Sequence, residues 1–194
     1  MTNEELRRRL FESGILHATG SESEDRENTG PGTRGLKNII LIGMPGCGKS
    51  TISRILSKEH GFKIIDADEE FKKQNGITPA ECITGHGEPE FRRRETKVLQ
   101  SLKPDSRACI ATGGGVVTVP ENLGVLKKLG FIVYIKRDLD KLSVKGRPLS
   151  AGKGVDKLFE ERGRYYSEWA DAEVENVNLR DVVKRIMGLY RENC

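Results

Sequence analysis

Short runs of apolar, β-branched residues recur along most of the chain and are separated by longer amphipathic stretches. Such runs are typical of strands buried on both faces of a sheet. The stretches between them have helical periodicity after Gly48, Pro79 and Pro89, and between Pro120 and Leu129. Because alternating strands and helices form right-handed crossovers, the pattern predicts a three-layer α/β domain with a parallel sheet. The predicted strands are NIILIG (38–43), FKIIDA (62–67), ACIATG (108–113) and FIVYI (131–135).

Residues 1–36 have a different pattern. TNEELRRRLFESG (2–14) predicts one short helix, with Thr2 and Glu5 as a capping box. The following HATGSESEDRENTGPGTRG lacks apolar periodicity and has the composition of a flexible linker. We therefore expect a helix plus linker over 1–36 and one domain over 37–194. We interpret the leader as an idle extension, with a helix that docks on a partner as the alternative.

Composition excludes several classes of protein. The chain is 36% hydrophobic and 32% charged, and no apolar run approaches the roughly 20 residues of a membrane helix. The net charge of +4 comes from basic and acidic residues that are interleaved, which favours a small anionic ligand over a nucleic-acid groove. Cys47, Cys82, Cys109 and Cys194 show no CxxC spacing, so we expect neither a disulfide framework nor a zinc site. Thiols of this kind indicate a reducing compartment, the cytoplasm.

The first predicted strand leads directly into GMPGCGKST (43–51), which matches the phosphate-binding P-loop. Glycines let backbone N–H groups converge on phosphate oxygens, and the N-terminus of the following helix adds positive potential. In this pattern Lys49 reaches the β- and γ-phosphates, and Ser50 ligates Mg²⁺. The strand and helix on either side favour a nucleotide site over a structural glycine turn. The residues expected to bind the nucleotide are Gly46, Cys47, Gly48, Lys49, Ser50 and Thr51.

Two segments after later strands are candidates for the acceptor site, because ligands collect beyond the carboxyl ends of parallel strands. In DADEEF, the spacing of Asp66 and Asp68 predicts opposite faces of a strand end, one for hydrated Mg²⁺ and one for an acceptor hydroxyl. A helix-capping aspartate followed by solvated acids is the alternative. In TGGGVV, glycines 113–115 either make a plain turn or let a ligand approach the backbone, and we favour the ligand.

The helix predicted after Pro89 carries three consecutive arginines. With 100° per residue, Glu95 falls about 40° from Phe91, inside the apolar stripe of this helix. A carboxylate on a buried stripe needs a cationic partner, since an unpaired buried charge is costly. Arg92 borders the stripe three residues earlier and can supply that partner.

The other two arginines have different expected environments. Arg93 points to solvent, and Arg94 lies on the opposite flank of the stripe, where Glu90 can pair with it. Of the three arginines, Arg92 is therefore the one expected to touch a ligand.

Together these segments resemble the shikimate kinases. GMPGCGKST, DADEEF, GEPEFRRRE, TGGGVV and RPLS (147–150) occur in the order and approximate spacing of that family. RGRYYSEWAD also resembles the family's R-x-P-L-Y-x-E-x-A-D stretch. The resemblance covers about residues 37–190, and the combination of these motifs is specific. The matching residues of the last stretch are Arg162, Tyr166, Glu168, Ala170 and Asp171.

The resemblance implies a P-loop kinase fold, with a mostly parallel five-stranded sheet of order 2-3-1-4-5 and a lid. It implies ATP-dependent phosphorylation of the 3-hydroxyl of shikimate, in the pathway to chorismate and the aromatic amino acids. ATP and Mg²⁺ are the implied cofactors. The implied partners are shikimate and ATP alone, with no nucleic acid and no membrane, and the enzyme is expected to be a monomer.

The resemblance also implies roles at the acceptor site. Arg92 and Arg162 would clamp the shikimate carboxylate, because a planar guanidinium presents paired donors. Asp68 would be the candidate base and would hold the hydroxyls. Glu95 would fix Arg92 from behind. Backbone groups of Gly113, Gly114 and Gly115 would complete the site.

At the donor end, Lys49 and Arg147 would neutralise phosphate charge, while Ser50 and Asp66 would hold Mg²⁺ and its waters. Arg147 lies in KGRPLSAGKG, a basic, glycine-hinged segment that we interpret as a lid over about 145–154, with a flexible surface loop as the alternative.

The chain departs from the family near this lid. The segment before Arg147 is short and lacks the family's extra arginine, so that Lys145 is the nearest cation. Ser150 replaces a leucine, and Arg164 and Tyr165 replace Pro-Leu.

Two other functions fit the P-loop. A kinase for a related small acid such as gluconate would keep the loop without needing the pair of arginines. A non-catalytic nucleotide-binding module would present the leader helix to a partner, but it would have no use for an acceptor base and a lid cation.

Overall fold

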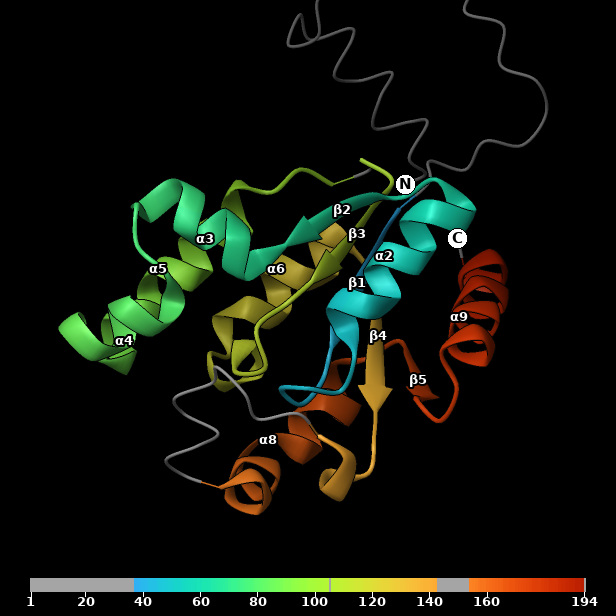
Figure 1. Cartoon of the computed structure of the whole chain (residues 1–194). Coiled ribbons are helices and arrows are strands. Elements are labelled where there is room, and N and C mark those ends of the chain that lie inside the picture. The colour runs from blue at the N-terminus through green and yellow to red at the C-terminus, as the bar shows by residue number, and fades with distance from the viewer. Residues whose placement is uncertain (1–36, 105, 143–153, 194) are drawn as a thin grey trace, which may run out of the picture. The chain divides into compact units, whose positions relative to one another are not determined.

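The computed structural model describes residues 37–104, 106–142 and 154–193. In this part of the chain five strands form one sheet of order β2-β3-β1-β4-β5, and every pairing is parallel (Figure 1). The predicted α/β class and strand order are confirmed. The strands are β1 (Asn38–Ile42), β2 (Lys63–Asp66), β3 (Ala108–Ala111), β4 (Gly130–Lys136) and β5 (Ala172–Glu175).

Helices cover both faces of the sheet, as the alternating pattern predicts. α2 and α9 pack together over one face, and α6 and α8 cover the other (Figure 1). α3, α4 and α5 pack on one another around a second, smaller apolar cluster. The α-helices are α2 (Lys49–His60), α3 (Ala67–Asn75), α4 (Pro79–His86), α5 (Glu88–Ser101), α6 (Glu121–Leu129), α8 (Val155–Trp169) and α9 (Leu179–Asn193); the 3₁₀ turns are η1 (Val116–Thr118) and η2 (Leu139–Lys141).

Strands β1 and β3 are buried throughout, but the edge strands are not. All residues of β1 and β3 are buried, as predicted for a sheet covered on both faces. The same prediction is wrong for 62–67, because β2 is an edge strand on which Lys63 and Ile64 are exposed. At the other edge lies β5, AEVE, which has no apolar run that would have located it in the sequence.

The segment DADEEF does not continue as a strand. Asp66 ends β2 and is the N-cap of α3, where its carboxylate accepts a hydrogen bond from the Asp68 amide at 3.1 Å. Asp68 therefore lies in the first turn of a helix. The prediction that the two aspartates occupy opposite faces of a strand end is wrong, because residues two apart in a strand share a face and because helix α3 begins between them.

The carboxyl ends of β1, β2 and β3 deliver the P-loop, Asp66 and the glycine segment to the same edge of the sheet. No helix within the described residues is long and apolar enough to cross a membrane. The predicted leader helix and linker (1–36), and the lid residues Lys145, Arg147 and Ser150, lie outside the described residues.

Candidate active site

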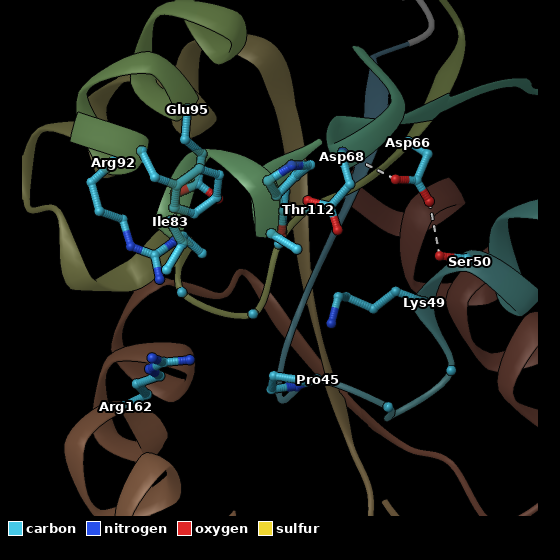
Figure 2. Close-up of a pocket in the computed structure, with 18 of the residues that line it drawn as sticks. Pro45, Lys49, Ser50, Asp66, Asp68, Ile83, Arg92, Glu95, Thr112 and Arg162 are labelled. Carbon is cyan, nitrogen blue, oxygen red and sulfur yellow. Dashed lines mark hydrogen bonds and ion pairs between the residues drawn. The ribbon is translucent and has the colours of Figure 1, made fainter. Parts of the chain in front are cut away.

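A cavity of about 350 Å³ lies at this edge of the sheet, between the P-loop and helices α3, α4, α5 and α8 (Figure 2). Polar side chains enter it from opposite ends: Lys49 and Ser50 at one end, Arg92 and Arg162 at the other. The other lining residues are Pro45, Gly46, Gly48, Thr51, Asp66, Asp68, Pro79, Ala80, Ile83, Phe91, Glu95, Thr112, Gly113, Gly114 and Gly115.

Lys49 is held against the P-loop. Its ammonium donates to the carbonyl oxygens of Gly43 at 2.8 Å and Met44 at 3.0 Å, and the residue is only 8% exposed. Gly43 has a φ of 141°, and a Cβ there would lie 2.6 Å from the carbonyl oxygen of Ile135, so a larger residue does not fit. Cys47 is fully buried and does not line the cavity, so its side chain is packing within the loop.

Ser50 and Asp66 are joined across the loop. The Ser50 hydroxyl donates to Oδ2 of Asp66 at 2.9 Å, while Oδ1 of the same carboxylate caps α3 (Figure 2). Asp66 is thus both a helix cap and a partner of the P-loop, which the sequence analysis treated as alternatives. Two hard oxygen ligands next to a phosphate site suit Mg²⁺, which takes few protein ligands and keeps its waters.

Asp68 lies between the two ends of the cavity. This residue is exposed and lines the cavity, and its side chain points toward the centre of the site (Figure 2). A Cβ on Gly113 would lie 3.5 Å from Oδ1 of Asp68, so the carboxylate borders the glycine segment.

Arg92 and Glu95 form a buried ion pair, as the helical wheel predicts. Nη1 of Arg92 donates to Oε2 of Glu95 at 2.7 Å, and Nη2 donates to Oε1 of Glu88 at 3.0 Å. The guanidinium also lies over the Phe91 ring, 4.8 Å from its centroid. Arg92 is 9% exposed and Glu95 4%. Glu88 is a partner that the residue-level analysis did not identify, although its spacing of four residues was a usable signal.

Burial and mutual attraction shift the pKa values of Arg92 and Glu95. Burial raises the pKa of the Glu95 carboxyl, and the charge of Arg92 opposes this shift. Burial opposes protonation of Arg92, but the charges and hydrogen bonds of Glu95 and Glu88 together outweigh it and raise the pKa of the guanidinium. Within the described residues, Oε1 of Glu95 and Nε of Arg92 are buried without a hydrogen-bond partner. These two atoms, which belong to residues that line the cavity, can therefore each still form a hydrogen bond.

The neighbouring arginines share one carboxylate. Arg94 donates to Glu90 at 2.6 Å, which confirms the predicted pair. Arg93 is 56% exposed as predicted, but it also forms two hydrogen bonds to Glu90, at 2.8 and 2.7 Å. Hydrogen bonds from Arg93 and then Arg94 lower the pKa of Glu90 to about 2. The view of Arg93 as merely solvated is thus incomplete, because its side chain folds back along α5.

The glycine segment is tightly enclosed by site residues. A Cβ on Gly113 would lie 2.7 Å from Oε1 of Glu95, one on Gly114 would lie 2.6 Å from Pro45, and one on Gly115 would lie 1.9 Å from Arg92. Real Cβ atoms do not come this close, so each glycine makes room for a different part of the site. The segment is not a plain turn, and the close approach is made by the protein's own side chains.

α8 brings two buried residues to the far side of the site. Arg162 is 2% exposed and lines the cavity one helical turn before Tyr166, which is fully buried. The Tyr166 hydroxyl donates to the Gly114 carbonyl, and its ring stacks on Tyr134. Burial raises the pKa of Tyr166. Tyr166 was matched to a motif, but no function was assigned to it from the sequence.

Asn176 is a further residue that the sequence analysis did not identify. It follows β5 and is 6% exposed, and its Nδ2 donates to the Cys47 carbonyl of the P-loop at 2.7 Å. A Cβ on Gly48 would lie 2.6 Å from the same nitrogen. No local pattern indicates a contact between residues this far apart in the sequence.

The chain is similar to known proteins over most of its length. The family model for shikimate kinase matches residues 45–190. A shikimate kinase of Clostridium beijerinckii is 38% identical over 166 residues, covering 81% of this chain and 98% of the relative. One from Legionella pneumophila is 38% identical over 170 residues, covering 81% and 97%. The structure of the Acinetobacter baumannii shikimate kinase in complex with shikimate superposes with a TM-score of 0.73 at 32% identity, covering 81% of this chain and 94% of that chain.

Proposed function

The chain belongs to the shikimate kinase family, and from this premise we propose that the cavity described above is where ATP and shikimate meet for phosphoryl transfer. Its activity is the ATP-dependent conversion of shikimate to shikimate 3-phosphate, a step of the shikimate pathway. The function is assigned to this cavity because of the order in which charged groups line it. A P-loop lies at one end, two buried arginines lie at the other, and a carboxylate stands between them.

The donor end binds ATP through the P-loop. The amides of the loop and the N-terminus of α2 face the phosphates, and Lys49 exchanges its carbonyl contacts for phosphate oxygens. Ser50 and Asp66 would hold Mg²⁺, a proposal supported by their 2.9 Å hydrogen bond beside the loop. When bound, the metal neutralises charge on the phosphates.

The acceptor end suits a small ring with one carboxylate and several hydroxyls. Arg92 and Arg162 bind the carboxylate, because both guanidinium groups are buried and line the same wall. Glu95 and Glu88 hold Arg92 in place. The unpartnered Oε1 of Glu95, among the described residues, is a ready acceptor for a ring hydroxyl.

The reaction follows from this arrangement. The 3-hydroxyl oxygen of shikimate attacks the γ-phosphorus, its proton passes to the Asp68 carboxylate, and the bond to the leaving ADP oxygen breaks. Positioning and charge neutralisation supply most of the acceleration, since the transition state of phosphoryl transfer is loose. Arg147 is proposed to close over the phosphates as an arginine finger; it lies outside the described residues and stays a prediction.

We further propose that the enzyme acts as a monomer in the cytoplasm. The groups that the proposed reaction uses, the P-loop, Asp68 and the two buried arginines, lie in one chain, which supports this proposal. Cys47, Cys82 and Cys109 are free and buried, which suits a reducing compartment. Size-exclusion chromatography with light scattering, run at the enzyme concentration of the assay, tests the first statement.

A coupled assay of ATP consumption with shikimate, quinate and gluconate tests the function. We expect turnover with shikimate and little with gluconate, which lacks the ring that spans Arg92 and Asp68. If shikimate does not raise ATP consumption above the background ATPase rate, the proposal fails.

A further inference from the structure

Two carbonyl groups, each in the peptide that precedes a glycine lining the cavity, are bound by a buried side chain that does not itself line the cavity. The Gly114 carbonyl accepts from the Tyr166 hydroxyl, and the Cys47 carbonyl accepts from Nδ2 of Asn176 at 2.7 Å. Tyr166 is fully buried and Asn176 is 6% exposed. One bond lies at the acceptor end of the cavity and the other at the donor end.

Peptide geometry links each of these carbonyls to the next amide. In a planar trans peptide the C=O of one residue and the N–H of the next point in opposite directions, and none of the described residues forms a cis peptide bond. With its carbonyl turned toward Tyr166, the Gly114 peptide directs the Gly115 N–H away from α8. By the same reasoning Asn176 directs the Gly48 N–H away from β5. Both glycines line the cavity.

The two amides are available to ligands. Within the described part of the chain, neither the Gly115 N–H nor the Gly48 N–H donates a hydrogen bond to a backbone or side-chain acceptor. Gly115 adjoins the guanidinium of Arg92, and Gly48 is the N-cap of α2 in the P-loop. Backbone N–H groups at such positions are anion donors.

We propose that Tyr166 and Asn176 are positioning residues, each serving one of the two substrates. Tyr166 orients the Gly115 amide toward the carboxylate of shikimate beside Arg92, and Asn176 orients the Gly48 amide toward the phosphates of ATP. The inference rests on the function proposed above and adds two residues that act on the ligands through the backbone; the Tyr166 hydroxyl also interacts with Arg162.

Packing and hydrogen bonds hold Tyr166 and Asn176 in place. The Tyr166 ring stacks on Tyr134 with centroids 5.1 Å apart, and its hydroxyl lies 3.8 Å from Sδ of Met44. The backbone N–H of Asn176 donates to the Lys136 carbonyl at 2.7 Å, which fixes this residue at the end of the sheet. A side chain that is locked by packing and hydrogen bonds holds its partner in one orientation.

The test compares three variants of the full chain. Y166F removes only the hydroxyl, N176A removes the amide, and Y190F is the matched control. The Tyr190 hydroxyl also donates to a backbone carbonyl, that of Lys37 at 2.6 Å, but at the amino end of β1 and away from the cavity. The quantities measured are the KM for shikimate, the KM for ATP, kcat and the thermal midpoint.

We expect Y166F to raise the KM for shikimate about tenfold and to leave the KM for ATP within about twofold, given the usual cost of an unsatisfied buried carbonyl. N176A should do the reverse, and Y190F should change neither KM. If Y166F lowers the thermal midpoint as Y190F does but leaves the KM for shikimate unchanged, the hydroxyl is only structural and the inference is overturned. Equal effects of either variant on both substrates overturn it as well.

Two ligands test whether the effects of Y166F and N176A arise at the Gly115 and Gly48 amides. A shikimate analogue with a hydroxymethyl group in place of the carboxylate should bind wild type and Y166F equally, because it offers no anion to the Gly115 amide. Inorganic tripolyphosphate, as a competitor of ATP, should lose affinity for N176A by the same factor as ATP. If the analogue still discriminates against Y166F, or if tripolyphosphate is unaffected, the assignment to these amides is wrong. Absence of wild-type turnover with shikimate would instead contradict the proposed function.

Discussion

Replacement of Arg92 by alanine tests whether the arginine proposed to bind shikimate differs in function from its neighbour on the same helix. Arg92 is 9% exposed, lines the cavity and contacts Glu95, Glu88 and the Phe91 ring. Arg93 is 56% exposed and donates to Glu90 on the same helix. The two substitutions remove the same charge from adjacent positions, so they differ only in what each guanidinium touches.

The magnitude follows from these contacts. A hydrogen bond to a charged group contributes about 1.5–3 kcal/mol, and an exposed ion pair contributes about 0–1 kcal/mol. R92A should therefore lose at least ~2 kcal/mol of transition-state binding, which is about 30-fold in kcat/KM for shikimate. R93A should stay within ~0.5 kcal/mol, about twofold.

Loss of Arg92 also leaves the buried carboxylate of Glu95 without its cation, which costs about 3 kcal/mol or more of folding stability. The double variant R92A/E95Q removes that unpaired charge, so its thermal midpoint should recover while kcat/KM stays low. Steady-state kinetics and differential scanning calorimetry on wild type, R92A, R93A and R92A/E95Q give both quantities. Equal losses of kcat/KM in R92A and R93A, or recovery of kcat/KM in the double variant, would refute the reasoning.

Three further predictions follow from single contacts. G115A should raise the KM for shikimate about tenfold, because its Cβ would lie 1.9 Å from Arg92, whereas G124A, with nothing within 4 Å, should have no effect. D68N should lower kcat by roughly 10²–10⁴ with a smaller change in KM, since Asp68 is proposed to accept the proton; unchanged kcat would exclude it as the base. The pKa of Glu90 is about 2, lowered from 4.5, so this carboxylate stabilises the fold above pH 4.5 and loses that contribution as the pH falls toward 2. Urea unfolding of E90Q should show a weaker pH dependence in that window, and an unchanged profile would contradict the assignment.

Local patterns determined much of this protein. The P-loop, the alternation of strands and helices, and the pairing of Arg92 with Glu95 depend on residues close in sequence, so periodicity and spacing predicted them. The same pattern separated the more exposed Arg93 from Arg94, although both arginines bind Glu90. It also led to the family resemblance, and through it to the strand order.

Long-range packing decided the rest. β5 is an edge strand with exposed glutamates, so it has no apolar run that would predict a strand. Helix α3 begins one residue after β2 because Asp66 caps it, which moved Asp68 off a strand and onto a helix. Nothing local indicates that Asn176 reaches a P-loop carbonyl or that Tyr166 reaches the glycine segment.

Glycines 113–115 show the difference between what the sequence determines and what the tertiary structure decides. From the sequence alone they were either a turn or a surface for a ligand, because a missing side chain says only that space is needed. The tertiary structure identifies what fills that space: Glu95, Pro45 and Arg92, which come from two other segments of the chain. A sequence records which residue is small, whereas the neighbour that requires it to be small is known only once the chain has folded.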